Sequence, residues 1–176
     1  MTVFAALLRA INVGGTGKLP MKELCDLCEE AGFSNPKTYI QSGNVLFQSR
    51  LAEAKVKAKL EPLLAAKIGK PVGVLVRTRT ELEQILTRNP FVGASPSQVL
   101  ILFLDAPPPA RALADLVIPG REEVKLDGRE VFIHYPDGMG RSKLLLPFAK
   151  LATGRNLNTV AKLGALARAM DAGASA

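Results

Sequence analysis

The sequence predicts an α+β protein built from two ferredoxin-like β-α-β-β-α-β units, each followed by an extra helix. Two observations predict this class: the order of strand-like and helix-like segments in the first half, and the return of the same order in the second half. The 176 residues are enough to bury a core, and 48% hydrophobic with 22% charged residues is typical of a globular protein. We therefore expect a duplication, with one unit at residues 1–91 and the other at residues 92–176.

The first half supplies every segment of one unit. Ser42-Gly43 is typical of a hairpin turn between two short strands. Pro62 lies inside the second helix, where we expect a kink or a break. The extra helix begins with Thr80 and Glu83, which have the spacing of a capping box. The predicted strands are residues 2–11, 36–41, 44–49 and 71–77, and the predicted helices are residues 20–31, 51–68 and 80–88.

The second half repeats this order after a linker at residues 92–97. Asp127-Gly128 is a strong hairpin signal. The last strand is very short, which makes it the weakest element of the second copy. The predicted strands are residues 98–105, 122–126, 129–135 and 153–155, and the predicted helices are residues 110–117, 141–151 and 156–170.

The first strand ends in a polar, glycine-rich segment that indicates a binding site. The stretch FAALLRAINVGGTGK places Arg9 and Asn12 at the strand end, Gly14 and Gly15 in the loop, and Lys18 before the helix. A glycine loop that opens a helix presents free backbone N–H groups, which favour an anion. The loop lacks the spacing of a Walker A motif and of a dinucleotide-binding fingerprint.

A second polar turn is expected at the same edge of the sheet. In the predicted topology, the end of the first strand and the hairpin between the second and third strands meet there. Ser42 and Asn44 of TYIQSGNVLF would then lie near Arg9, Asn12 and Lys18 and complete the predicted ligand-binding set with the two loop glycines. The alternative is that Asn12 and Asn44 hold their turns through hydrogen bonds to the backbone.

A further polar cluster falls at the starts of the last two predicted helices. Its segment from residue 138 to residue 143 has the composition of a backbone-amide nest for phosphate. The alternative is ordinary helix capping by an asparagine. The members of this second cluster are Arg141, Ser142, Lys143, Arg155, Asn156 and Asn158, and Arg77 and Arg79 close the fourth strand of the first unit.

Charge and composition limit the kinds of partner that the protein is expected to have. The net charge of +7 favours an anionic small molecule or a nucleic-acid backbone, but the basic residues form no dense run. No membrane span and no secretion signal are evident, which predicts a cytoplasmic protein. Cys25 and Cys28 lie within a predicted helix, and His134 lies on a strand, so no metal site, catalytic triad or cofactor is expected. Composition does not indicate an oligomeric state.

Several motifs together resemble a bacterial family known as domain of unknown function 1697. They are LLRAINVGG at residues 7–15, TYIQSGNVLF at 38–47, NPF at 89–91, RSKL at 141–144 and GRNLNTVAKL at 154–163. The resemblance covers nearly the whole chain and implies a duplicated ferredoxin-like fold, without an established activity. Ala10 stands where the family usually has Gly, and Leu157 stands where it usually has Trp.

Three functions from different classes remain open. The first is a binding module for a phosphate-bearing anion at the edge formed by the first strand and the glycine loop. The second is a small enzyme for a phosphorylated or carboxylated metabolite, in which Arg9 and Lys18 hold the anion and Ser42 or Lys18 transfers a proton. The third is a structural or protein-interaction module with no small-molecule ligand.

Overall fold

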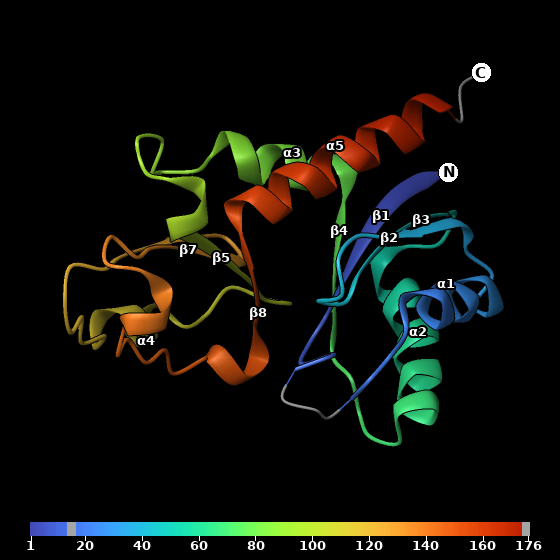
Figure 1. The fold of residues 1–176 in the computed structure, drawn as a ribbon, viewed down its shortest axis with the longest axis horizontal. Coiled ribbons are helices and arrows are strands. Elements are labelled where there is room, and N and C mark those ends of the chain that lie inside the picture. Colours follow the sequence, from blue (N-terminus) through green and yellow to red (C-terminus); the bar gives the residue numbers. More distant parts are fainter. Residues whose placement is uncertain (14–16, 174–176) are drawn as a thin grey trace. The chain divides into compact units, whose positions relative to one another are not determined.

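The computed structural model describes residues 1–13 and 17–173, and it confirms the α+β class with two four-stranded antiparallel sheets (Figure 1). The strand order is β2-β3-β1-β4 in one sheet and β6-β7-β5-β8 in the other. In both sheets the first strand of the copy lies between its third and fourth strands, which is the ferredoxin-like order. The predicted duplication is therefore present in the topology.

The first sheet is built on a strand that is apolar on both faces. Strand β1 pairs antiparallel with β3 and β4, so that Ala5 lies opposite Leu46 on one side and Arg77 on the other. Helices α1 and α2 lie against one face of this sheet (Figure 1). The bounds are β1 (Thr2–Leu8), α1 (Met21–Glu30), β2 (Ser34–Thr38), β3 (Asn44–Ser49), α2 (Glu53–Ile68) and β4 (Val74–Thr78).

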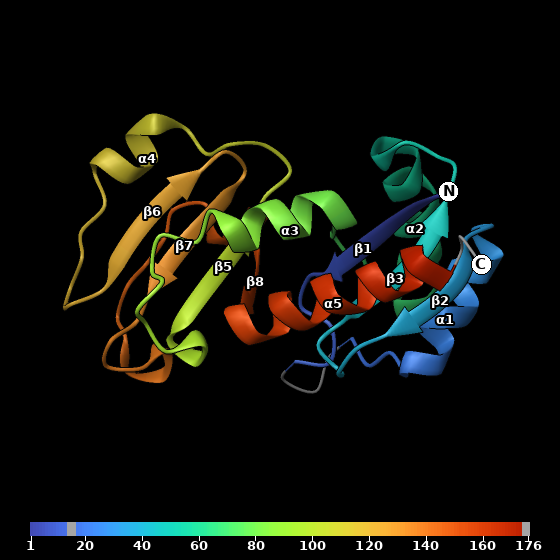
Figure 2. The same ribbon diagram turned by 90° about the horizontal axis from the view of Figure 1, so that it is seen from above.

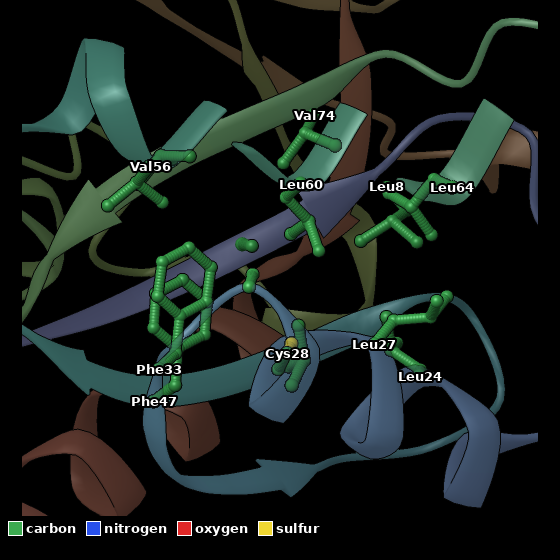
Figure 3. Close-up of a cluster of buried hydrophobic side chains, with 14 of the residues drawn as sticks. Leu8, Leu24, Leu27, Cys28, Phe33, Phe47, Val56, Leu60, Leu64 and Val74 are labelled. Carbon is green, nitrogen blue, oxygen red and sulfur yellow. The ribbon is translucent and has the colours of Figure 1, made fainter. Parts of the chain in front are cut away.

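The core under these helices is aliphatic with a pair of stacked aromatic rings. Figure 3 shows Phe33 and Phe47 with their rings overlapping, and the ring centroids are 4.3 Å apart. Helix α2 adds Leu60 and Leu64, both fully buried, on either side of Pro62. Although an internal proline removes one helical hydrogen bond, α2 continues through it without a break, since both halves pack on the same core.

The opposite face of the first sheet is also buried. Gln48 on β3 is 3% exposed, and its Nε2 donates to the carbonyl of Met170 in α5 (Leu157–Gly173) at 3.4 Å. The chain divides into two compact units, Met1–Glu83 with Lys162–Ala176, and Gln84–Ala161. Packing thus groups the chain differently from the repeat, whose boundary at residue 91 stays a prediction.

Helix α3 (Arg79–Thr87) directly follows β4 and begins earlier than the capping prediction placed it. The backbone N–H of Glu81 donates to Thr78 Oγ1 at 3.2 Å, and the N–H of Thr78 donates to Glu81 Oε2 at 2.8 Å. The capping box is therefore Thr78 with Glu81. The predicted box of Thr80 and Glu83 was wrong, because the same spacing occurs two residues earlier and the helix starts at the first instance; Glu83 instead binds Arg79 at 2.9 Å.

The second copy has the same four-stranded sheet as the first, but not all of the predicted helices. Figure 2 shows β5, β6 and β7 side by side, with their order completed by the short β8. The bounds are β5 (Val99–Phe103), α4 (Ala110–Ala114), β6 (Glu123–Asp127), β7 (Glu130–His134) and β8 (Thr153–Asn156), with short 3-10 turns at Pro96–Gln98, Met139–Arg141 and Ala149–Leu151. Among the described residues, no helix has both the length and the apolar character needed to span a membrane.

The helix predicted over residues 141–151 is wrong. Residues 142–148 are non-helical, and their exposure alternates, so that Leu144 and Leu146 face the core while Lys143 and Leu145 face solvent. This period of two belongs to extended backbone rather than to a helix. Pro147 adds to the effect, because a proline removes a backbone donor and disfavours helical backbone at the preceding residue.

Candidate functional site

Asn12 closes the loop that leads from β1 to α1. Its Oδ1 accepts the N–H of Leu19 at 2.8 Å, and its Nδ2 donates to the carbonyls of Leu19 at 3.1 Å and Gln41 at 2.9 Å. The backbone N–H of Asn12 also donates to the carbonyl of Gly17 at 3.2 Å. One side chain therefore fixes both ends of the loop and ties them to the hairpin that precedes β3, as the turn-holding alternative predicts.

The backbone around this loop is strained. Ala10, Asn12 and Ile40 have φ values of 51°, 57° and 50°, in the left-handed region. This region costs an L-residue about 1–2 kcal/mol, and it is an outlier for a β-branched side chain such as Ile40. Such strain concentrates at functional sites, where the surrounding contacts enforce the shape.

A cavity of about 390 Å³ opens beside this loop, at the start of α1. Pro20 is the N-cap residue, and no side chain caps the helix start. The first backbone hydrogen bond at this end runs from the N–H of Leu24 to the carbonyl of Pro20. In the described residues the N–H groups of residues 21–23 have no recorded acceptor. The lining residues are Asn12, Lys18, Leu19, Pro20, Met21 and Gln41.

Two lysines give this region its charge. Lys18 lines the cavity and is exposed, and its ammonium makes no ion pair within the residues that the structure describes. Lys70, which no sequence motif indicated, reaches the same loop: a Cβ on Gly17 would lie 3.7 Å from its Cε. Its position was predictable, since the loop before β4 shares a sheet edge with the end of β1 in this topology.

The other predicted ligand-binding residues lie near this cavity without lining it. The side chain of Arg9 lies over Gly73, where an added Cβ would be 3.1 Å from Arg9 Cδ. Asn44 is fully buried, and its Nδ2 donates to Ser42 Oγ at 2.8 Å and to the carbonyl of Tyr39 at 3.0 Å. Gly14 and Gly15 lie outside the described residues. A ligand-binding role for this set stays a prediction.

The second predicted cluster is split by the structure. Arg141, Ser142 and Lys143 line another cavity of about 320 Å³ in the second unit. Ser142 Oγ donates a short hydrogen bond to Glu122 Oε1, which lowers the pKa of that carboxyl group. Glu122 and Tyr135 also line the cavity and were not predicted, because they are distant in sequence and carry no motif.

The remaining members of that cluster have structural partners. Asn156 Oδ1 accepts the N–H of Thr159 at 2.9 Å, which is the N-cap bond of α5, whereas Asn158 is exposed. Arg155 is buried, and burial lowers its pKa to about 10. Arg77 is fully buried, and Arg79 pairs with Asp171 at 2.9 Å.

The cysteines and the histidine form no catalytic arrangement in the described part of the chain. Burial raises the pKa of Cys28 to about 12, and burial also raises the pKa of the half-buried Cys25. His134 Nδ1 lies 3.5 Å from Glu123 Oε1, and the His134 ring packs near Phe91. No three His, Cys, Asp or Glu residues among those described are placed to hold a metal ion.

The comparisons with known proteins agree with this architecture. A solved structure, "The structure of conserved bacterial protein SP0830 from Streptococcus pneumoniae", is 26% identical to this chain, with a TM-score of 0.77 over 94% of this chain and 98% of that one. No curated protein matches the chain. The family model described as "Protein of unknown function (DUF1697)" matches residues 1–132, three quarters of the sequence. The chain therefore belongs to the DUF1697 family, as its motifs predicted.

Proposed function

We propose that the chain binds an anionic, phosphate-bearing ligand in the cavity at the start of α1. The observation that carries this proposal is the uncapped start of a ten-residue helix, which opens onto a cavity of about 390 Å³ beside the ammonium of Lys18. A helix start presents N–H groups and about half a positive charge, both of which favour an anion. The ligand takes the place of the missing side-chain cap.

The charges around the cavity support the same ligand. Lys18 and Lys70 lack a carboxylate partner in the described chain, so a phosphate group supplies their counter-charge. Glu23, in the first turn of α1, already pairs with Lys67 at 2.8 Å. Its negative charge is therefore partly compensated and opposes an incoming anion less than an unpaired carboxylate does.

The hydrogen bonds of Asn12 support a preformed site. They hold the backbone on both sides of the cavity, at Leu19 and at Gln41, before any ligand arrives. A site whose shape is fixed in advance loses less conformational entropy on binding. In this proposal Asn12 positions the walls, while Lys18 and the helix N–H groups contact the ligand.

The proposal is tested by calorimetric titration with pyrophosphate, at low and at moderate salt. We expect binding to the native chain and about tenfold weaker binding to Lys18→Met, since a charged hydrogen bond contributes about 1.5–3 kcal/mol. Lys70→Met should weaken binding less, because Lys70 reaches the loop rather than the cavity lining. The matched control is Lys55→Met, an exposed lysine of α2 away from the cavity.

Two results contradict the proposal. One is equal affinity in the native protein, Lys18→Met and Lys55→Met, which indicates attraction by overall charge. The other is the absence of pyrophosphate binding by a natively folded protein. In that case the interaction-module hypothesis gains support.

A further inference from the structure

The second unit holds a separate cavity in which charges of opposite sign face the same space. Its volume is about 320 Å³, within the usual range for small-molecule sites. The negative side is Glu122, and the positive side is Arg141 with Lys143. Within the described residues, none of these three side chains forms an ion pair. Opposite charges therefore line one cavity without forming an ion pair with each other.

Glu122 is held in place while its charge stays uncompensated. Oε1 accepts the hydrogen bond of Ser142 Oγ, and that oxygen in turn accepts the N–H of Leu144 at 3.1 Å. Oε2 is buried and accepts no hydrogen bond in the described chain; a Cβ on Gly120 would lie 3.0 Å from it. Because this buried oxygen has no hydrogen bond, a nearby cation stabilises the carboxylate.

Tyr135 lines the same cavity near Glu122. It is 7% exposed, and the structure records no hydrogen bond of its hydroxyl group within the described residues. Burial, followed by the charge of Glu122, raises the pKa of Tyr135, so this hydroxyl is neutral at physiological pH. A neutral phenol both donates and accepts hydrogen bonds, so it suits an ammonium or a hydroxyl group of a ligand.

The positive side keeps its cations available for a ligand. Asp137, which also lines the cavity, is paired with Arg121, whose Nε donates to Asp137 Oδ2 at 3.0 Å. That ion pair, with a smaller contribution from the charge of Arg141, lowers the pKa of Asp137. Within the described residues neither Arg141 nor Lys143 has a carboxylate at ion-pair distance. Arg141 and Lys143 therefore remain available to an anionic group.

We propose that this cavity binds a small zwitterion, whose ammonium group lies toward Glu122 and Tyr135 and whose phosphate or carboxylate group contacts Arg141 and Lys143. A ligand with both charges compensates both sides of the cavity at once, whereas a simple anion leaves Glu122 repelling it and a simple amine leaves the two cations uncompensated. The site is independent of the anion cavity proposed above, which lies in the first unit.

The test uses three probes: O-phosphoethanolamine carries both charges, whereas its two halves, ethanolamine and inorganic phosphate, carry one kind of charge each. Binding to the full chain is measured by calorimetry at millimolar probe concentrations. We expect O-phosphoethanolamine to bind more tightly than both single-charge probes. Lys143→Met and Glu122→Gln should each weaken its binding about tenfold, which is typical for the loss of one charged partner.

The controls separate this site from other effects. Lys150→Met removes an exposed lysine of the same unit outside the cavity and should leave affinity unchanged. The titrations are repeated in a Lys18→Met background, which weakens phosphate binding at the first cavity; there O-phosphoethanolamine should still bind more tightly than inorganic phosphate. Equal binding of inorganic phosphate and O-phosphoethanolamine overturns the zwitterion proposal. Failure of O-phosphoethanolamine to bind the native chain, or full affinity in a folded Lys143→Met variant, also overturns it.

Discussion

Arg77 in β4 and Arg155 in β8 occupy equivalent positions in the two sheets. Arg77 pairs with Ala5 of β1, and Arg155 pairs with Ile101 of β5, each in the middle of the first strand of its copy. In both, Nη1 donates to the carbonyl of the preceding residue, at 2.8 Å for Val76 and 2.9 Å for Gly154. The duplication therefore extends from the strand order to a single buried side chain.

Replacing a buried arginine should cost more stability than replacing an exposed one. Arg155→Met removes the donor to Thr153 Oγ1 at 2.8 Å and to the carbonyl of Gly154, so we expect a loss of about 1–3 kcal/mol. The control is Arg168→Met, whose exposed ion pair with Glu83 contributes about 0–1 kcal/mol. Urea unfolding measures both, and equal losses would contradict the structural role of Arg155.

The capping box of α3 can be tested by two threonine substitutions. Thr78→Ala removes the acceptor for the N–H of Glu81 and should lower the free energy of unfolding by about 0.5–2 kcal/mol. Thr80→Ala alters an exposed residue one position into the helix and should change it by less than about 0.5 kcal/mol. A larger loss of stability for Thr80→Ala than for Thr78→Ala would contradict this and identify Thr80 as the capping residue.

Ala10→Gly should stabilise the protein. Ala10 is exposed with a φ of 51°, a conformation that glycine adopts without strain, so we expect a gain of about 0.5–1 kcal/mol after the entropy cost of glycine. The matched control is Ala66→Gly in the exposed interior of α2, where glycine should cost about 1 kcal/mol. The melting temperature should rise for Ala10→Gly and fall for Ala66→Gly in a thermal unfolding experiment.

The two cysteines should differ in their reaction with iodoacetamide. A pKa of about 12 leaves Cys28 with roughly one thiolate in ten thousand at pH 8, and the side chain is buried. Cys25 is half-buried with a more modestly raised pKa, so it should react first, though more slowly than a free cysteine. Mass spectrometry of the native protein locates the label, and its rate should rise with pH. Early labelling of Cys28 would contradict its burial.

Sequence patterns predicted the sheets better than the connections between them. The order of strand-like and helix-like segments, with turn signals at Gly43 and Gly128, predicted the strand order and the duplication. Residues 141–151 were misassigned because RSKLLLPFAKL has many helix formers, whereas the observed exposure follows a period of two. Local propensity gave way there to packing of alternate leucines on the sheet.

The candidate site was predictable in place but not in detail. As the predicted topology implies, the end of β1 and the hairpin before β3 lie at one edge of the sheet, where Lys18 and Gln41 share a cavity. The pairing of Asn12 with Leu19 and the packing of Arg9 over Gly73 depend on side-chain directions in left-handed backbone. Such directions do not follow from residue spacing.

The extended segment at residues 142–146 also shows how the two copies of a duplicated protein can diverge. To reach the strand order of the two sheets, the chain must cross back to the far edge of the sheet. About five extended residues span as far as about eleven helical ones. The first copy makes this crossing with α2, which satisfies its own backbone hydrogen bonds. The second copy makes it with an open segment whose Ser142 reaches Glu122. The same strand order is thus compatible with a helical crossing in one copy and with an extended crossing in the other.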